Sequence, residues 1–203
     1  MLCYEIVTPH GLARVTMHRA PEGRAVLLLG HGAGGAVTAP DLVVTAQSAK
    51  RAGVHVALVE QPYRVAGRRA PAPAKQLDAA WLAVAEQLAD GPLHGLPTVF
   101  GGRSSGARVA CRTAEEGAAT AVLCLAFPVH PPGRPEKDRL PELAGVDVPV
   151  LVVQGRSDPF GQPEPAPHRD VVLLPGNHSL QGDLDGLARA VQEWLERVLR
   201  LVS

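Results

Sequence analysis

The sequence lacks an excess of charge of either sign, and it lacks any long apolar segment. Its 20 basic and 20 acidic residues balance to a formal net charge of zero, so no overall field attracts the chain to nucleic acid or to an anionic membrane surface. No apolar run reaches the roughly 18 residues that a membrane-spanning helix requires. We therefore expect a soluble protein with neither a nucleic-acid partner nor a membrane partner.

Cysteine is scarce as well. The chain holds only Cys3, Cys111 and Cys124, an odd number without metal-ligand spacing. The first residues also lack the basic segment followed by an apolar segment that marks a secretion signal. These features favour a reducing, cytoplasmic location. Neither clustered cysteine and histidine nor a His-Glu-x-x-His pattern occurs, so we expect no metal and no organic cofactor.

The pattern of apolar residues predicts the fold class. A length of 203 residues suits one domain, 1–203. Beyond an N-terminal hairpin, short apolar segments alternate with segments in which apolar residues recur at helical spacing. The expected strands are 25–29, 54–60, 97–102, 120–127, 149–155 and 170–176, and the expected helices are 40–52, 75–89, 104–117 and 184–201. This alternation predicts an α/β fold with a mostly parallel central sheet and helices on both faces.

The segment "GRSSG", residues 102–106, is a Gly-x-Ser-x-Gly sequence between an expected strand and an expected helix. In that context the glycines relieve crowding around a strained serine whose hydroxyl projects above the sheet, as a catalytic nucleophile requires. Five-residue matches of this kind also arise by chance, and a glycine-rich turn is the alternative. Under the functional interpretation Ser104 is the nucleophile.

Two further polar residues follow strands later in the chain. Asp158 lies in "GRSDPFG" after one expected strand, and His178 lies in "PGNHSL" after the next. Taken singly, an Asp before Pro is more often a turn former and such a His is an ordinary loop residue. Together with Ser104 they give the chain order Ser, Asp, His, each beyond a different strand, which is the order of an α/β-hydrolase triad. We expect His178 to act as the base and Asp158 to orient it.

The loop "LGHGAGG", residues 29–35, follows the first long strand. It contains neither Gly-x-Gly-x-x-Gly nor a Gly-Lys-[Ser/Thr] ending, which disfavours a phosphate-binding loop. A His-Gly segment here matches the loop that supplies one oxyanion-hole amide, while the residue after the nucleophile supplies the other. We therefore expect the hole to be formed by the backbone N–H groups of Ala33 and Ser105, with Gly34 as the alternative to Ala33. His31 is expected to shape this loop.

The segments "GHGAGG", "GRSSGARVA", "FPVHPPGRPEK", "QGRSDPFG" and "PGNHS" together resemble a small α/β-hydrolase family. It is the family related to the testis-expressed thirty protein and to the third subunit of the non-specific lethal chromatin complex, with dienelactone hydrolases as more distant relatives. The resemblance implies an α/β-hydrolase fold without a large cap domain, and by position it also implies a triad of Ser104, Asp158 and His178. Ser105 departs from the many relatives that carry a bulkier residue such as methionine.

The leading functional hypothesis is a serine hydrolase that cleaves a small ester or thioester through an acyl-enzyme. The segments 63–73 and 127–137 should border an open pocket, and the residues expected to line it are His31, Tyr63, Arg69, Arg103 and His130. Arginines at its mouth would favour an acidic acyl group. Two alternatives stay open: a binding or scaffolding protein that keeps the fold without hydrolysis, and acyl transfer or dienelactone-type ring opening. The sequence leaves the natural substrate and the oligomeric state undetermined.

Overall fold

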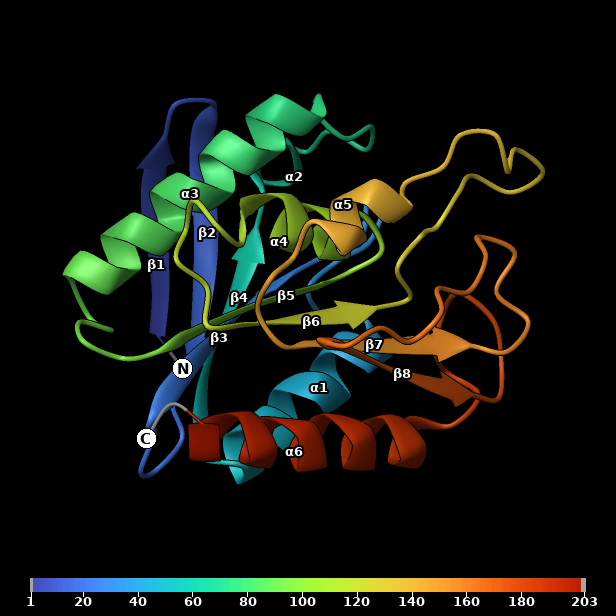
Figure 1. The fold of residues 1–203 in the computed structure, drawn as a ribbon. Coiled ribbons are helices and arrows are strands. Elements are labelled where there is room, and N and C mark those ends of the chain that lie inside the picture. The colour runs from blue at the N-terminus through green and yellow to red at the C-terminus, as the bar shows by residue number, and fades with distance from the viewer. Residues whose placement is uncertain (1, 202–203) are drawn as a thin grey trace.

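The computed structural model describes residues 2–201, which form one eight-stranded sheet with helices on both faces (Figure 1). The strands are β1 (Leu2–Thr8), β2 (Gly11–His18), β3 (Ala25–Gly30), β4 (Val54–Glu60), β5 (Thr98–Arg103), β6 (Ala121–Leu125), β7 (Val150–Gly155) and β8 (Arg169–Leu174). The helices are α1 (Pro40–Arg51), α2 (Pro62–Val65), α3 (Ala74–Asp90), α4 (Ser105–Thr113), α5 (Leu140–Ala144) and α6 (Leu184–Leu201).

The strand order across the sheet is β1-β2-β4-β3-β5-β6-β7-β8. The hairpin β1–β2 is antiparallel and joins β4 in antiparallel register, whereas every pair from β4 through β3 to β8 is parallel. β3, β6 and β7 are buried along their whole length, as expected for parallel strands covered on both faces. Their carboxyl ends therefore meet at one edge of the sheet.

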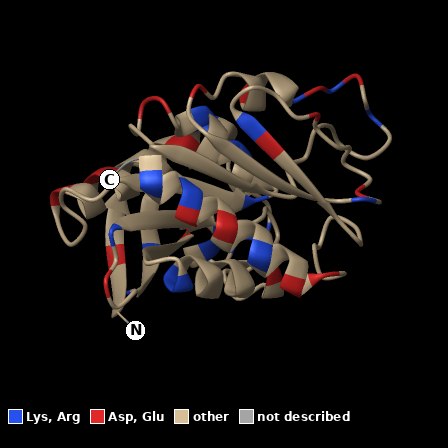
Figure 2. Ribbon diagram, turned by 60° about the horizontal axis from the view of Figure 1, so that its bottom comes forward, with Lys and Arg blue, Asp and Glu red and all other residues tan. Residues whose placement is uncertain are grey.

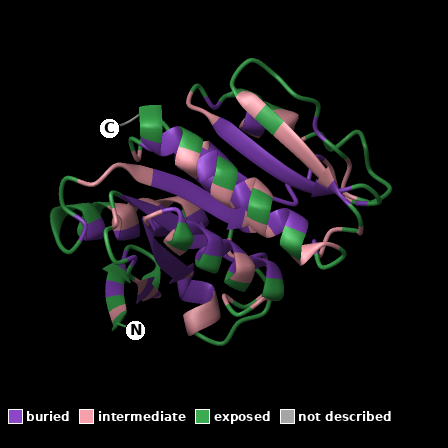
Figure 3. Cartoon of the chain, turned by 90° about the horizontal axis from the view of Figure 1, so that it is seen from below, coloured by how far each residue is buried: buried purple, intermediate pink, exposed green. Residues whose placement is uncertain are grey.

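Each face of the sheet carries its own hydrophobic core. Helices α1 and α6 pack together on one face, and α3, α4 and the short α5 cover the other (Figure 1). Figure 3 shows buried and exposed segments alternating along α6. Its buried residues, among them Leu187, Val191, Trp194 and Val198, recur at the three- and four-residue spacing of an amphipathic helix. Figure 2 shows positive and negative residues interspersed on the exposed side of α6.

The α/β fold predicted from the sequence, with a mostly parallel central sheet and helices on both faces, is confirmed. Two differences concern helices. α4 spans Ser105–Thr113, not 104–117: residues 114–118 form turns, and the positive φ of 49° at Ala118 is incompatible with a continuing helix. The short helices α2 and α5 were not predicted: they span four and five residues, too few to show a helical period, and each begins with a proline in its first turn. Within residues 2–201 no helix has the length and apolar character needed to cross a bilayer.

Candidate active site

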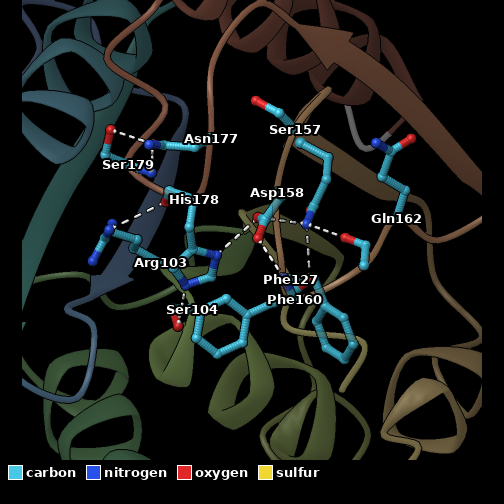
Figure 4. Close-up of polar contacts among 12 residues, drawn as sticks. Arg103, Ser104, Phe127, Ser157, Asp158, Phe160, Gln162, Asn177, His178 and Ser179 are labelled. Atoms are coloured by element: carbon cyan, nitrogen blue, oxygen red, sulfur yellow. Dashed lines mark hydrogen bonds and ion pairs between the residues drawn. The ribbon is translucent and has the colours of Figure 1, made fainter. Parts of the chain in front are cut away.

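Loops that follow four strands converge at the carboxyl edge of the sheet. Ser104 follows β5, Asp158 follows β7, His178 follows β8, and His31 follows β3. Figure 4 shows the first three of these residues connected by hydrogen bonds, with Arg103 and Phe160 beside them. The sheet thereby brings together side chains that are far apart in the sequence.

Ser104 lies on a strained turn between β5 and α4. Its φ of 52° and ψ of −108° are unfavourable for a residue with a side chain. A Cβ at Gly102 would lie 2.4 Å from the carbonyl carbon of Gly106, and one at Gly106 would lie 2.8 Å from the backbone of Gly30. Both flanking positions therefore require glycine for close backbone approach. The result is a sharp turn with the Ser104 hydroxyl at the N-terminus of α4.

The imidazole of His178 lies between the other two side chains. Its Nε2 is 2.9 Å from Ser104 Oγ and its Nδ1 is 2.8 Å from Asp158 Oδ2. A carboxylate oxygen accepts, so Nδ1 carries the proton and Nε2 is left to accept the hydroxyl proton of Ser104. The Asp158 side chain has no exposed surface, and that of His178 retains 17%. The arrangement can transfer a proton from Ser104 to His178 beside a buried carboxylate.

Gln154, which sequence reasoning missed, helps hold Asp158. Its Nε2 lies 2.8 Å from Asp158 Oδ2, 2.8 Å from the carbonyl oxygen of Gly161 and 3.1 Å from that of Phe127. The backbone N–H of Phe160 donates to the other carboxylate oxygen of Asp158 over 2.9 Å. Gln154 is fully buried. A polar residue inside the otherwise apolar strand β7 was the available sequence signal.

The loop after β3 is fixed by His31. The backbone N–H of Gln61 donates to His31 Nε2 over 3.1 Å, so His31 Nδ1 carries the proton and donates to the carbonyl oxygen of Gly32 over 2.8 Å. Burial lowers the pKa of His31, which keeps it neutral and in this tautomer. The peptide group that contains the Gly32 carbonyl also contains the N–H of Ala33. His31 thus orients the donor expected for the oxyanion hole.

Tyr63 lies beneath the same loop. Its side chain is buried, and its hydroxyl donates to the carbonyl oxygen of Ala33 over 2.6 Å. Tyr63 was expected to line the pocket, but its hydroxyl is committed to the loop. Within residues 2–201, no backbone acceptor is recorded for the N–H groups of Ala33, Gly34 and Ser105, so none of the three is committed to another carbonyl oxygen. The choice between Ala33 and Gly34 stays open.

The other expected pocket residues differ in their surroundings. Arg103 forms an ion pair with the buried Asp41 of α1, and its Nη2 donates to the carbonyl oxygen of His178 (Figure 4), so its charge is not available at a pocket mouth. Arg69 is exposed. His130 is partly buried, with Nδ1 at 2.9 Å from the Pro131 carbonyl oxygen and its backbone N–H donating to the carbonyl oxygen of Phe160.

Across residues 2–201, no group of three or more His, Cys, Asp and Glu side chains gathers as metal ligands do.

Residues 23–182 match the sequence model of a family described as the alpha/beta hydrolase domain. The chain belongs to this family. The matched segment spans the Gly-rich loop, the strained serine, Asp158 and His178. A comparison with curated protein sequences finds no match.

Solved structures with the same fold are similar over nearly the whole length of this chain. An α/β serine hydrolase without lid from Xanthomonas campestris superposes with a TM-score of 0.76 at 21% identity, covering 97% of this chain and 94% of that one. An esterase from Pyrococcus furiosus gives 0.78 at 15% identity, with 97% and 89% covered. A dienelactone hydrolase from Anabaena variabilis gives 0.73 at 18% identity, with 97% and 96% covered. At these identities the likeness shows the shared fold.

Proposed function

We propose that the protein is a serine hydrolase that cleaves a small ester or thioester through an acyl-enzyme, with Ser104, His178 and Asp158 as its triad. The observation that carries the proposal is the hydrogen-bonded line from Ser104 Oγ through both nitrogens of His178 to Asp158, with distances of 2.9 and 2.8 Å. The strained φ of Ser104 adds to it. A hydroxyl, an imidazole and a buried carboxylate in this order activate a nucleophile.

Acylation would begin when Ser104 Oγ attacks the substrate carbonyl and its proton passes to His178 Nε2. Asp158 stabilises the imidazolium that results and holds Nδ1 in its protonated form. The negative charge that develops on the carbonyl oxygen would be bound by the N–H groups of Ser105 and of Ala33 or Gly34. Collapse of the tetrahedral intermediate then releases the alcohol or thiol, which takes the proton from His178.

Deacylation repeats these steps with water. His178 removes a proton from the attacking water, the same N–H groups bind the oxyanion, and Ser104 leaves with the proton returned to Oγ. Every step uses residues of this chain, so the proposal includes no metal and no organic cofactor.

The proposed substrates are short. One solved structure with this fold is described as lacking a lid, and in this chain the segments bordering the site hold only the short helices α2 and α5. Because Arg103 is paired with Asp41, Arg64, Arg68 and Arg69 remain as candidates for attracting an acidic acyl group, and Arg69 is exposed. Replacing Arg69 with alanine should then raise KM for anionic esters selectively, and equal effects on neutral esters would rule out that role.

The test is labelling with a fluorophosphonate probe, which reacts with activated serines. Wild-type protein should be labelled on Ser104, located by peptide mass spectrometry, and Ser104→Ala should not. Ser157→Ala is the matched control, because Ser157 is an exposed serine whose hydroxyl donates only to the Gly176 carbonyl; it should label like wild type. Hydrolysis of short p-nitrophenyl esters and of short acyl thioesters would then separate the two substrate classes.

A folded protein that is not labelled would overturn the proposal. The non-catalytic binding or scaffolding alternative would then be favoured. The narrower likeness to the testis-expressed thirty protein and the non-specific lethal complex subunit rests on sequence segments alone. Dienelactone-type ring opening is disfavoured by the serine at position 104, since a cysteine nucleophile is usual for that chemistry.

A further inference from the structure

The phenyl ring of Phe160 stacks on the imidazole of His178. The two ring centroids lie 4.0 Å apart and the ring planes are inclined by 26°, and Figure 4 shows the two rings side by side next to Ser104. Aromatic pairs in proteins more often meet edge to face or with centroids farther apart. The contact covers one face of the imidazole, the group on which the proposed reaction places a positive charge.

The position of Phe160 is fixed by its main chain. Its N–H donates to Asp158 Oδ1 over 2.9 Å, and its carbonyl oxygen accepts the N–H of His130 over 3.1 Å. The turn at Gly161, with φ of 91°, follows directly. The backbone that carries the ring is therefore anchored to the same carboxylate that bonds Nδ1 of the imidazole, and the stack is part of the site's geometry.

We infer that Phe160 stabilises the imidazolium form of His178 by placing the negative face of its ring against the cation. This inference rests on the proposed function, because the cation arises when His178 accepts the proton of Ser104. The face of an aromatic ring carries a negative partial charge that attracts cations within about 6 Å of its centroid. The attraction is stronger in the transition state than in the ground state, where the imidazole is neutral, so it accelerates the reaction.

Three other groups contact His178, and the test requires that these contacts stay unchanged when Phe160 is replaced. Asp158 Oδ2 contacts Nδ1 from the loop after β7, and Ser104 Oγ contacts Nε2 from the turn after β5. The guanidinium of Arg103 contacts only the backbone carbonyl of His178, and its charge is paired with Asp41. None of these contacts involves the Phe160 side chain, so a change at Phe160 can leave them in place.

The first test is independent of catalysis. In the Ser104→Ala background, the protonation of His178 is followed by NMR with isotope-labelled histidine, and the resonance is assigned by its loss in His178→Gln. Phe160→Leu keeps an apolar side chain but removes the ring, and it should lower the titration midpoint of His178 by about half to one pH unit. Phe160→Tyr keeps the ring face and should leave the midpoint unchanged. Equal midpoints for Phe and Leu would overturn the inference.

The second test is kinetic. Phe160→Leu should lower the maximal kcat on a short p-nitrophenyl ester by about 3- to 10-fold and shift the acidic limb of its pH profile to lower pH, while Phe160→Tyr retains both. Pro159→Ala is the loop control: Pro159 is exposed and adjacent, and its loss should change neither. A fall in kcat without the shift would assign Phe160 a packing role. If wild type shows no activity, the proposed function fails, and the NMR titration still decides the stacking effect.

Discussion

The guanidinium of Arg103 lies 2.9 Å from the carboxylate of Asp41, whose side chain is only 1% exposed. This ion pair ties the residue before Ser104 to the first turn of α1. Arg103 Nη2 also donates to the carbonyl oxygen of His178 over 3.2 Å, and a Cβ at Gly32 would lie 2.9 Å from Arg103 Nη1. One side chain therefore contacts all three loops that carry the proposed nucleophile, base and oxyanion hole.

Replacing Arg103 with methionine should lower the free energy of unfolding and reduce the reactivity of Ser104. The change leaves Asp41 buried without its partner, which costs about 3 to 5 kcal/mol of unfolding free energy at neutral pH. Burial already raises the pKa of Asp41, and Arg103 opposes that rise. Without Arg103 the carboxyl should protonate in the folded state, so the loss measured by urea unfolding should be smaller at pH 5 than at pH 8.

The effect on the site is measured at a temperature where the variant is folded. The rate of fluorophosphonate labelling should fall at least 10-fold in Arg103→Met and recover in part in Arg103→Lys. Arg112 on α4 supplies the control, since its side chain is about as buried as that of Arg103 and it pairs with Asp78 and Glu142 over 2.6 and 3.2 Å, away from the site. Arg112→Met should lower stability but label at the wild-type rate. Equal slowing in both variants would show that Arg103 acts through global stability alone.

The sequence predicted where the polar residues of the site lie but not how they are held. Ser104, Asp158 and His178 each follow an apolar strand, and parallel strands deliver their carboxyl ends to one edge. The pairing of Arg103 with Asp41 and the stacking of Phe160 on His178 depend on side-chain directions after folding. Neither the spacing of apolar residues nor a sequence motif predicts those side-chain directions. The same limit applied to Tyr63, whose hydrogen bond to the Ala33 carbonyl oxygen could not be predicted from the sequence.

Gln154→Met should weaken the orientation of Asp158. Methionine fills a similar volume but donates no hydrogen bond, so the carboxylate loses the donor at 2.8 Å and the carbonyls of Phe127 and Gly161 lose theirs. A hydrogen bond to a charged group contributes about 1.5 to 3 kcal/mol. We expect kcat on a short ester to fall about 10- to 100-fold with little change in KM.

The control for Gln154 is a second glutamine near the site. Gln162 is exposed, and its side chain donates to the carbonyl of Arg156 without touching Asp158. Gln162→Met should keep the wild-type kcat. If Gln154→Met also retains full activity while remaining folded, the carboxylate is held sufficiently by His178 and by the backbone N–H of Phe160, and Gln154 is only a packing residue.

The neutral state of His31 should make the stability of the fold sensitive to acid. Burial lowers the pKa of His31 from 6.5, so between 6.5 and the lowered value the unfolded chain binds more protons than the folded chain. The free energy of unfolding must then decrease as the pH falls through that window. His31→Gln removes the titrating group, and the free energy of urea unfolding should depend less steeply on pH between pH 7 and pH 5 than in wild type.

His18 and His55 also have lowered pKa values, so some dependence of stability on pH should persist in this variant. His168→Gln changes an exposed histidine and should preserve the wild-type curve. An unchanged slope in His31→Gln would mean that the loop releases His31 to solvent before it is protonated.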